Sequence, residues 1–161
     1  MPISDELLRS AMRHWTSGVS IVTSRLDAEQ RGLTANSLTS ISLDPPLISI
    51  TLAARTRTHA LTAQAGAFAV TILAADQAAL AARFAGEIPE LGDRFAGLET
   101  FTLETGCPLL AGGLAWMDCR VAFMYPMKAA TLFVGELTAA KFVETGEPLV
   151  YHHRAYGRFT P

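Results

Sequence analysis

The sequence predicts a mainly β protein with a few helices, folded as a closed β-barrel. Short runs rich in β-branched residues recur along the chain and are separated by turn-forming residues, a pattern typical of antiparallel strands. Two internal alanine-rich segments have helical composition, but helices and strands do not alternate regularly. Regular alternation would indicate a parallel sheet, so the pattern argues against a doubly wound dinucleotide-binding fold.

The first expected element is a helix that follows Ser4. The Ser4 hydroxyl is suited to capping a helix, Asp5 and Glu6 supply an acidic first turn, and apolar residues follow at helical spacing as far as Trp15. Gly18 is the expected end of this helix, because glycine readily adopts the left-handed conformation found after a last turn. His14 would then lie on the helix, where it packs or faces water.

The remaining elements are read from composition. Strands are expected at 19–23, 33–42, 47–52 and 68–73, and helices at 58–65 and 76–84, each helix short enough to plug or cap a barrel. After a region rich in glycine and proline, 86–97, two long β-type runs predict a hairpin of strands 114–125 and 131–143, joined by residues 126–128. Either 149–151 or 156–159 is expected to be a last strand.

Length and composition predict one domain, residues 1–161, with a single core. Hydrophobic residues make up 50% of the chain and charged residues 17%. This is more apolar material than a small monomer needs, so part of it is expected in the interface of a homodimer. The net charge is −2 and no basic run occurs, which argues against nucleic acid as a partner.

We expect a cytoplasmic protein with no membrane partner. The chain start has no cationic segment followed by an apolar run, and no apolar stretch reaches the roughly 18 residues that span a bilayer. Cys107 and Cys119 are too few and too far apart for a zinc site or a disulfide scaffold and are expected to be buried thiols. His152 and His153 would point to opposite faces of a strand, so no metal site is expected.

The most unusual segment is the polar run 34–42. It carries five hydroxyl side chains and one amide in nine residues, and it leads into the rigid turn Asp44-Pro45-Pro46. Serine and threonine also suit a strand that faces solvent. Here, however, the run alternates cleanly on neither face, and small hydroxyls beside exposed amides allow close approach of a flat, polar-edged ring or a phosphate. From chemistry alone, a solvent-facing strand and a ligand site are about equally favoured.

A second polar segment, 55–59, stands at the start of a predicted helix. Free N–H groups and the positive end of the helix dipole favour an anion there, and Arg55 and Arg57 with two threonines would form a phosphate cradle. Solvated arginines on a capped helix are the alternative. Walker, dinucleotide-fingerprint and nucleophile-elbow motifs do not occur in the sequence, so a nucleotide would be held by another device. The core is expected to take the aromatic residues Trp15, Phe68, Phe84, Trp116, Phe123 and Phe133.

Taken in order, these segments resemble the flavin reductase-like family, whose FMN-binding split barrels are the small reductase components of two-component flavin monooxygenases. The similarity runs nearly end to end. It is carried by the segments 18–23, 32–37, 40–46, 57–59, 66–70, 74–77, 83–85, 108–116, 119–121 and 132–137.

The resemblance implies an FMN-binding split β-barrel of Greek-key type that dimerises and holds FMN or FAD in a groove at the subunit interface. Three groups of residues receive roles: the flavin contacts Thr34, Ala35, Asn36 and Ser37, the isoalloxazine edge meets Ser40, Ile41 and Ser42, and the phosphate lies near Arg57, Thr58 and His59. No side chain is expected to be catalytic. The nicotinamide and the flavin carry the hydride transfer themselves, and the protein supplies stacking geometry and a dry slot.

The implied activity is that of an NAD(P)H-dependent flavin reductase, which moves a hydride from NADH or NADPH to flavin N5 and supplies reduced flavin to a partner monooxygenase. One departure stands out. Many active members carry Asp-His, with the histidine near the nicotinamide or flavin, where this chain has Ala129 and Ala130. Two alternatives therefore stay open: a flavoprotein that retains its flavin for another redox reaction, and a non-catalytic flavin carrier.

Overall fold

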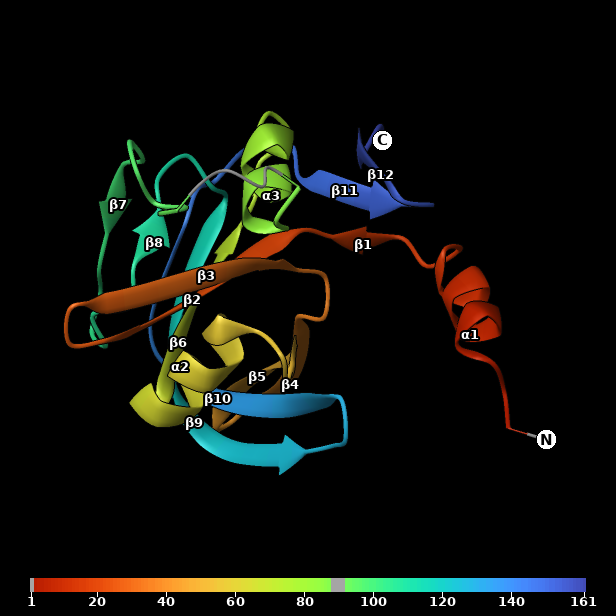
Figure 1. Ribbon diagram of the computed structural model, residues 1–161. Helices are drawn as coiled ribbons and strands as arrows, with labels where there is room; N and C mark the ends of the chain where they lie inside the picture. Colours follow the sequence, from red (N-terminus) through yellow and green to blue (C-terminus); the bar gives the residue numbers. More distant parts are fainter. Residues whose placement is uncertain (1, 88–91) are drawn as a thin grey trace.

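The computed structural model describes residues 2–87 and 92–161 (Figure 1). Seven strands form its main sheet: β2 (Ser20–Leu26), β3 (Glu29–Ala35), β4 (Thr39–Leu43), β5 (Pro46–Ala53), β6 (Ala67–Ile72), β9 (Ala115–Pro126) and β10 (Ala130–Phe142). All pairings are antiparallel, and the order across the sheet is β3-β2-β6-β9-β10-β5-β4. The predicted strand runs are confirmed to within a few residues, except that 33–42 is not one strand.

A short link turns this sheet into a barrel. Strands β3 and β4 lie at opposite ends of the strand order, yet only residues 36–38 separate them in the chain. Such a link spans at most about 14 Å, so the two ends of the sheet are held close together. Ser37 attaches this link to β5, because its Oγ accepts the N–H of Thr51 at 3.0 Å and donates to the Thr51 carbonyl at 3.1 Å. The predicted split-barrel fold is confirmed.

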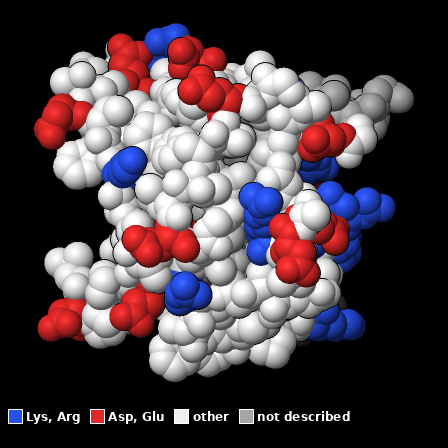
Figure 2. Space-filling view, turned by 90° about the vertical axis from the view of Figure 1, so that its left-hand side faces the viewer, with Lys and Arg blue, Asp and Glu red and all other residues white. Residues whose placement is uncertain are grey.

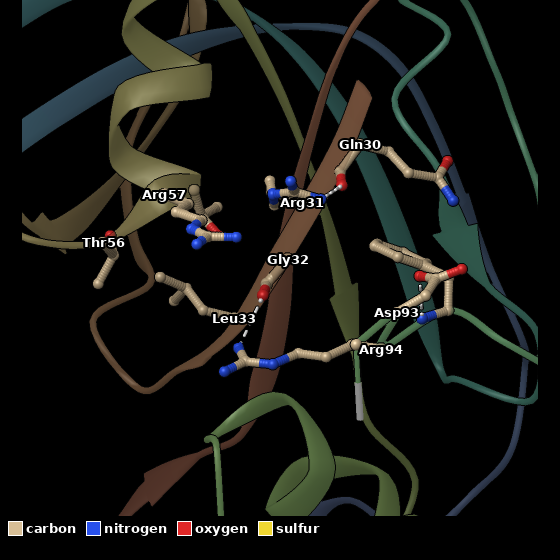
Figure 3. A pocket seen from close by; sticks show the side chains of 11 residues that line it. Gln30, Arg31, Gly32, Leu33, Thr56, Arg57, Asp93 and Arg94 are labelled. Atoms are coloured by element: carbon tan, nitrogen blue, oxygen red, sulfur yellow. Dashed lines mark hydrogen bonds between the residues drawn. The ribbon is translucent and has the colours of Figure 1, made fainter. Parts of the chain in front are cut away.

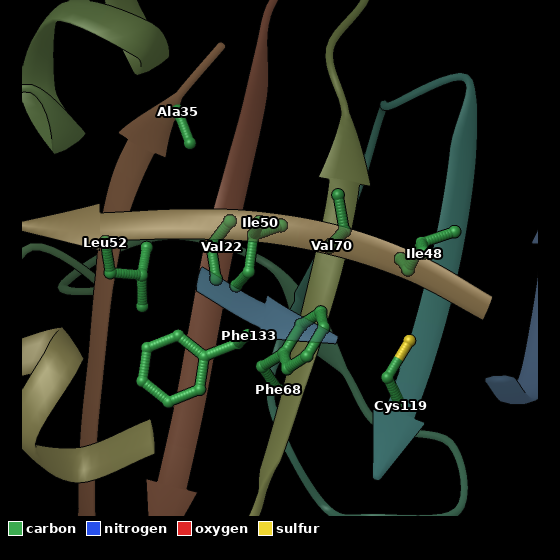
Figure 4. Close-up of a cluster of buried hydrophobic side chains, with 9 residues drawn as sticks. All are labelled: Val22, Ala35, Ile48, Ile50, Leu52, Phe68, Val70, Cys119 and Phe133. Atoms are coloured by element: carbon green, nitrogen blue, oxygen red, sulfur yellow. The ribbon is translucent and has the colours of Figure 1, made fainter. Parts of the chain in front are cut away.

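The barrel interior holds one apolar cluster (Figure 4). It consists of Val22, Ala35, Ile48, Ile50, Leu52, Phe68, Val70, Cys119 and Phe133. Gly135 on β10 is needed for this packing, because a Cβ there would lie 2.5 Å from the Phe68 ring and 2.8 Å from the Cβ of Cys119. The absence of a side chain lets Phe68 fill the centre of the barrel.

Two helices pack against the barrel. Helix α2 (Arg57–Ala65) lies against β2 and β3, and helix α3 (Ala78–Phe84) covers the other side of the same strands. Strand β2 is consequently buried on both faces: Val22 points into the barrel, while Ile21 joins Phe84 in a second cluster. Both predicted helices are confirmed. Helix α2 begins after the Thr56 cap and ends at Gly66, which has the positive φ of 65° expected at a helix end.

The long hairpin of β9 and β10 is confirmed, and so are both C-terminal strand candidates. Strand β11 (Leu149–His152) pairs with β12 (Ala155–Arg158), and β11 also pairs with the short β1 (Ser17–Gly18). A separate two-stranded sheet contains β7 (Thr100–Phe101) and β8 (Leu109–Leu110). Of the glycine- and proline-rich region 86–97, residues 88–91 lie outside the described part of the chain.

The predicted end of the first helix is wrong. Helix α1 spans Asp5–Met12 with Ser4 as its cap, and it stops six residues before Gly18. The chain leaves the helix early because Ser17 and Gly18 pair with Tyr151 and Val150 in β1, and this requires extended backbone. His14 therefore lies beyond the helix.

Two aromatic residues depart from the expected core. Phe68, Phe84 and Phe133 are fully buried, and Trp116 is partly buried, but Trp15 is 67% exposed and Phe123 is 54% exposed. Trp15 follows helix α1, none of whose residues is buried against the barrel.

Cys107 and Cys119 are both buried free thiols, as expected. Within residues 2–87 and 92–161, no helix is long and apolar enough to cross a membrane.

Candidate functional site

Strand β3 and the loop after it border three pockets. The first has a volume of about 350 Å³ and lies between β3, the start of helix α2 and the turn after residue 91 (Figure 3). Three arginines from these three elements line it, namely Arg31, Arg57 and Arg94. We call it the arginine pocket.

Two further pockets lie at the other end of β3, and both include Asn36 and Val19 in their walls. The smaller, of about 190 Å³, is lined by Val19, Thr34, Ala35, Asn36, Ala85, Glu87, Tyr151 and Tyr156. The larger, of about 560 Å³, lies between the end of helix α1 and residues 36–39, and its walls include Met12 and Trp15. We call these two pockets the Asn36 cavities.

Among the predicted flavin contacts 34–37, only the Asn36 side chain is free for a ligand. Thr34 Oγ1 donates to the carbonyl of Ala81 at 2.6 Å, and Ser37 is bound to Thr51. Ala35 is buried in the barrel. Asn36 is exposed, and its amide makes no hydrogen bond with any described residue. Thr34, Ala35 and Ser37 therefore have structural roles. Asn36 offers a hydrogen-bond donor and an acceptor at the mouth of both cavities.

The predicted contacts Ser40, Ile41 and Ser42 lie on strand β4, at the edge of the sheet. They line none of the three pockets. A bulge between Ser40 and Ser42 leaves Ile41 without a partner on β5, and Ile41 is half exposed. Within one chain this group is thus not brought together with Asn36 in one pocket, and its assignment to the isoalloxazine edge stays a prediction.

The segment 57–59 divides at the start of helix α2. Arg57 and Thr58 line the arginine pocket, whereas His59 does not. The Nε2 atom of His59 lies 2.8 Å from Oγ1 of Thr131, and its ring packs edge-on against Phe133 with the ring centres 5.5 Å apart. Successive helical residues differ in direction by about 100°, so neighbouring side chains point to different surroundings.

Sequence reasoning missed several residues that line the pockets. Arg31 and Arg94 come from segments with no recognisable motif, and Tyr151 and Tyr156 lie more than a hundred residues from Asn36. Arg94 has a structural role, because its Nη1 donates to the carbonyls of Gly32 at 3.2 Å and of Phe84 at 2.9 Å. For Arg31, the sequence offered one signal of a role in the site: this residue directly precedes Gly32 and the polar run.

Ala130 is the first residue of β10 and pairs with Ala53 on β5. The adjacent Thr131 is turned toward His59, and since successive strand residues point to opposite faces, the His59 ring does not fill the space at Ala130. Lys128 lies exposed in the turn before β10. His152 is bonded to Thr16 near helix α1, with 2.8 Å between Nδ1 and Oγ1.

Burial changes the acidity of several groups. It raises the pKa of Cys119 to about 12, with smaller contributions from Asp118 and Cys107. Burial also raises the pKa of Tyr156, again with contributions from Glu87 and Tyr151. Tyr156, which lines the smaller Asn36 cavity, therefore keeps its proton at neutral pH. On the face in Figure 2, acidic and basic side chains are mixed between large uncharged areas. Among the described residues, no group of three or more His, Cys, Asp or Glu side chains is arranged to hold a metal ion.

Comparison with known proteins adds independent findings. The model of the flavin reductase like domain family matches residues 12–160. The reductase component of 4-hydroxyphenylacetate 3-monooxygenase from Thermus thermophilus is 35% identical over 95% of this chain and 95% of its own. An NADH-dependent FMN reductase of Agrobacterium fabrum is 36% identical over 94% of this chain and 84% of its own. The solved NADH:FAD oxidoreductase of Streptomyces globisporus superimposes with a TM-score of 0.90, at 32% identity, over 100% of both chains.

Proposed function

This chain belongs to the flavin reductase-like domain family, and we propose on that premise that it is an NAD(P)H-dependent flavin reductase, an NAD(P)H:flavin oxidoreductase. One observation carries the proposal. Both the sequence and the fold match named reductases over essentially the whole of each chain. This favours a reductase over a protein that only stores or carries flavin.

The Asn36 cavities suit the flavin ring. Their walls carry flat or small apolar groups, such as Tyr151, Tyr156 and Ala85, and Asn36 lies at the edge with an unused amide. A flat ring with a polar rim needs apolar faces and a few well-placed hydrogen-bonding groups. At the other end of β3, Arg57, Thr58 and the first free amides of helix α2 suit the phosphate.

The residues of this chain bind and orient, and none is assigned a proton-transfer step. When bound, the flavin supplies the hydride acceptor and the nicotinamide supplies the hydride. The Asn36 amide offers a donor to the ring edge, where negative charge develops on reduction, and the Tyr156 hydroxyl is a second donor in the same cavity. The aromatic and apolar residues among the cavity walls, such as Tyr151 and Trp15, would hold the rings for stacking. The methyl side chain of Ala130 offers no hydrogen-bonding group to a ligand.

We infer that the protein acts as a homodimer and that the second copy completes the flavin site. Helix α1 buries none of its residues, and Met12 and Trp15, both more than half exposed, line the larger Asn36 cavity. Ile41 and the 91% exposed Leu43 lie on the free edge of β4. Apolar side chains around an open cavity are typical of the core of an obligate interface.

The proposed partner is a separate oxygenase that receives reduced flavin. The Thermus relative is the reductase component of a monooxygenase, and another relative, from Rhodococcus opacus, is the reductase component of 4-nitrophenol 4-monooxygenase/4-nitrocatechol 2-monooxygenase. A reductase of this kind binds flavin as a substrate and releases it after reduction. We place the reaction in the cytoplasm, where NADH and NADPH are supplied.

Steady-state oxidation of NADH and NADPH, followed with added riboflavin, FMN or FAD, tests the proposal. We expect turnover that depends on added flavin and a purified protein with little flavin colour. Flavin binding without turnover would instead support a carrier. A deeply coloured protein that oxidises NADH only with a further acceptor would support a flavoprotein that retains its cofactor.

A further inference from the structure

The arginine pocket places two guanidinium groups from different elements in one hollow. Arg31 lies on β3 and Arg57 on the first turn of α2, and Figure 3 shows both side chains extending into the space between these elements. No described residue accepts a hydrogen bond from Arg57. An anion in this pocket would interact favourably with both guanidinium groups and with the positive end of the helix.

The partners of Arg31 leave it available to a ligand. Its Nη2 lies 2.9 Å from Oε1 of Glu29, but both side chains are partly exposed, and such surface pairs contribute little. Its Nη1 donates to the carbonyl of Gln30 at 3.1 Å, while its Nε is shielded from solvent and has no acceptor among the described residues. An anion reached by a rotation of this side chain would provide acceptors that the present contacts lack.

The other charged groups of the pocket are already engaged. Arg94 is held by the carbonyls of Gly32 and Phe84, and Oδ1 of Asp93 accepts the N–H of Phe95 at 2.9 Å. Helix α2 has no acidic residue in its first turn, so its positive end is not neutralised from within. The two guanidinium groups and the helix start match one anionic phosphate group, and the buried Thr58 also lines the pocket.

We propose that Arg31 and Arg57 form a two-arginine clamp for one phosphate group of the nucleotide ligand, and that Arg31 is a specificity residue for phosphorylated ligands. This inference rests on the proposed reductase function and extends it to a residue outside the predicted site. The phosphate belongs either to the flavin, as the monoester of FMN or the pyrophosphate of FAD, or to the 2′ position of NADPH. Both sources present the same chemistry to the clamp.

Binding measurements with R31Q, R57Q and the double variant test the clamp. As a control, R120Q removes the same charge from an exposed arginine on β9 that lines none of the three pockets. Quenching of flavin fluorescence gives the affinities for riboflavin, FMN and FAD without turnover. If the clamp holds the flavin phosphate, each pocket variant should lose about ten- to hundredfold in affinity for FMN and FAD and almost nothing for riboflavin.

The kinetic arm separates the two phosphate sources. If the clamp holds the 2′-phosphate, R31Q should raise KM for NADPH about ten- to hundredfold while KM for NADH and flavin affinity stay unchanged. R31Q behaving like R120Q with all five ligands would overturn the proposal. Equal losses for riboflavin and FMN would also overturn it, because they would indicate a general disturbance of β3. Absence of turnover in the wild type would refute the reductase function. The flavin titrations would still test whether Arg31 and Arg57 bind the phosphate.

Discussion

The imidazole Nε2 of His59 lies 2.8 Å from the Oγ1 of Thr131, and this contact joins the first turn of helix α2 to strand β10. Phe133, two residues further along β10, packs edge-on against the same ring. The contact is well placed to hold the start of α2, which carries Arg57 and Thr58, against the barrel wall. His59 thus follows the predicted phosphate residues in the sequence, but its side chain contacts Thr131 and Phe133 in the barrel.

We expect the contact between His59 and Thr131 to stabilise both the fold and the site. Replacing either residue, in His59→Ala or Thr131→Val, removes a partly buried hydrogen bond and should lower the free energy of unfolding by about 1 to 3 kcal/mol. Urea denaturation of the two single variants and the double variant measures the coupling between them. If the losses simply add, the contact contributes nothing of its own, and its proposed positioning role fails.

Asn36 should carry much of the flavin affinity. Its amide is free at the mouth of both Asn36 cavities, so Asn36→Ala leaves a ligand group unpaired and should cost about 1 to 3 kcal/mol, or roughly ten- to hundredfold in affinity. The control is Gln64→Ala, which removes an exposed amide from helix α2 away from all three pockets. Equal flavin dissociation constants for the two variants would show that the ring lies elsewhere.

Ala130 should limit the reaction with the nicotinamide more than the binding of flavin. The structure shows that His59 is held on Thr131 and does not replace a histidine at position 130. In Ala130→His, a restored hydrogen bond should stabilise the transition state by about 1 to 3 kcal/mol, which is roughly a ten- to hundredfold faster reduction. Stopped-flow reduction by NADH and NADPH measures this rate. A fast wild type that the histidine does not improve would mean that another group has taken over.

The buried thiols should make stability fall at alkaline pH. The pKa of Cys119 rises from its ordinary value of 9.0 to about 12 in the folded chain, so the unfolded chain ionises first. The contribution is fully present below pH 9 and is lost as the pH rises toward 12. Urea midpoints between pH 8 and pH 11 should therefore drop more steeply in the wild type than in Cys119→Ala. Parallel pH profiles would contradict this burial effect.

The dimer proposal predicts a particle of about twice the 17.3 kDa mass of one chain. Light scattering at micromolar concentration measures this mass directly. Trp15→Glu, which places a charge among the exposed apolar side chains next to the larger Asn36 cavity, should weaken both association and flavin binding. A monomeric wild type that still binds flavin would rule out a site completed by the second copy.

The sequence by itself determined the positions of the helices and of most strands in the main sheet. Short β-rich runs between turn-forming residues placed the strands, the Ser4 cap and the alanine-rich segments indicated the helices, and the ordered segments from Gly18 to Leu137 identified the family. These signals are local, because each depends on the propensity or spacing of neighbouring residues. The polar run around Asn36 was likewise visible as a candidate site from its composition.

Only the tertiary structure decided which of those residues share a pocket. The end of helix α1 depends on the pairing of Ser17 with Tyr151, a residue more than a hundred positions away. Arg31 and Arg57 line one pocket because β3 packs against α2, whereas the His59 ring lies outside that pocket, with its Nε2 2.8 Å from Oγ1 of Thr131. Such relationships follow from the closure of the sheet by residues 36–38, and the physical reason is that a closed barrel sets distances between side chains that no local propensity encodes.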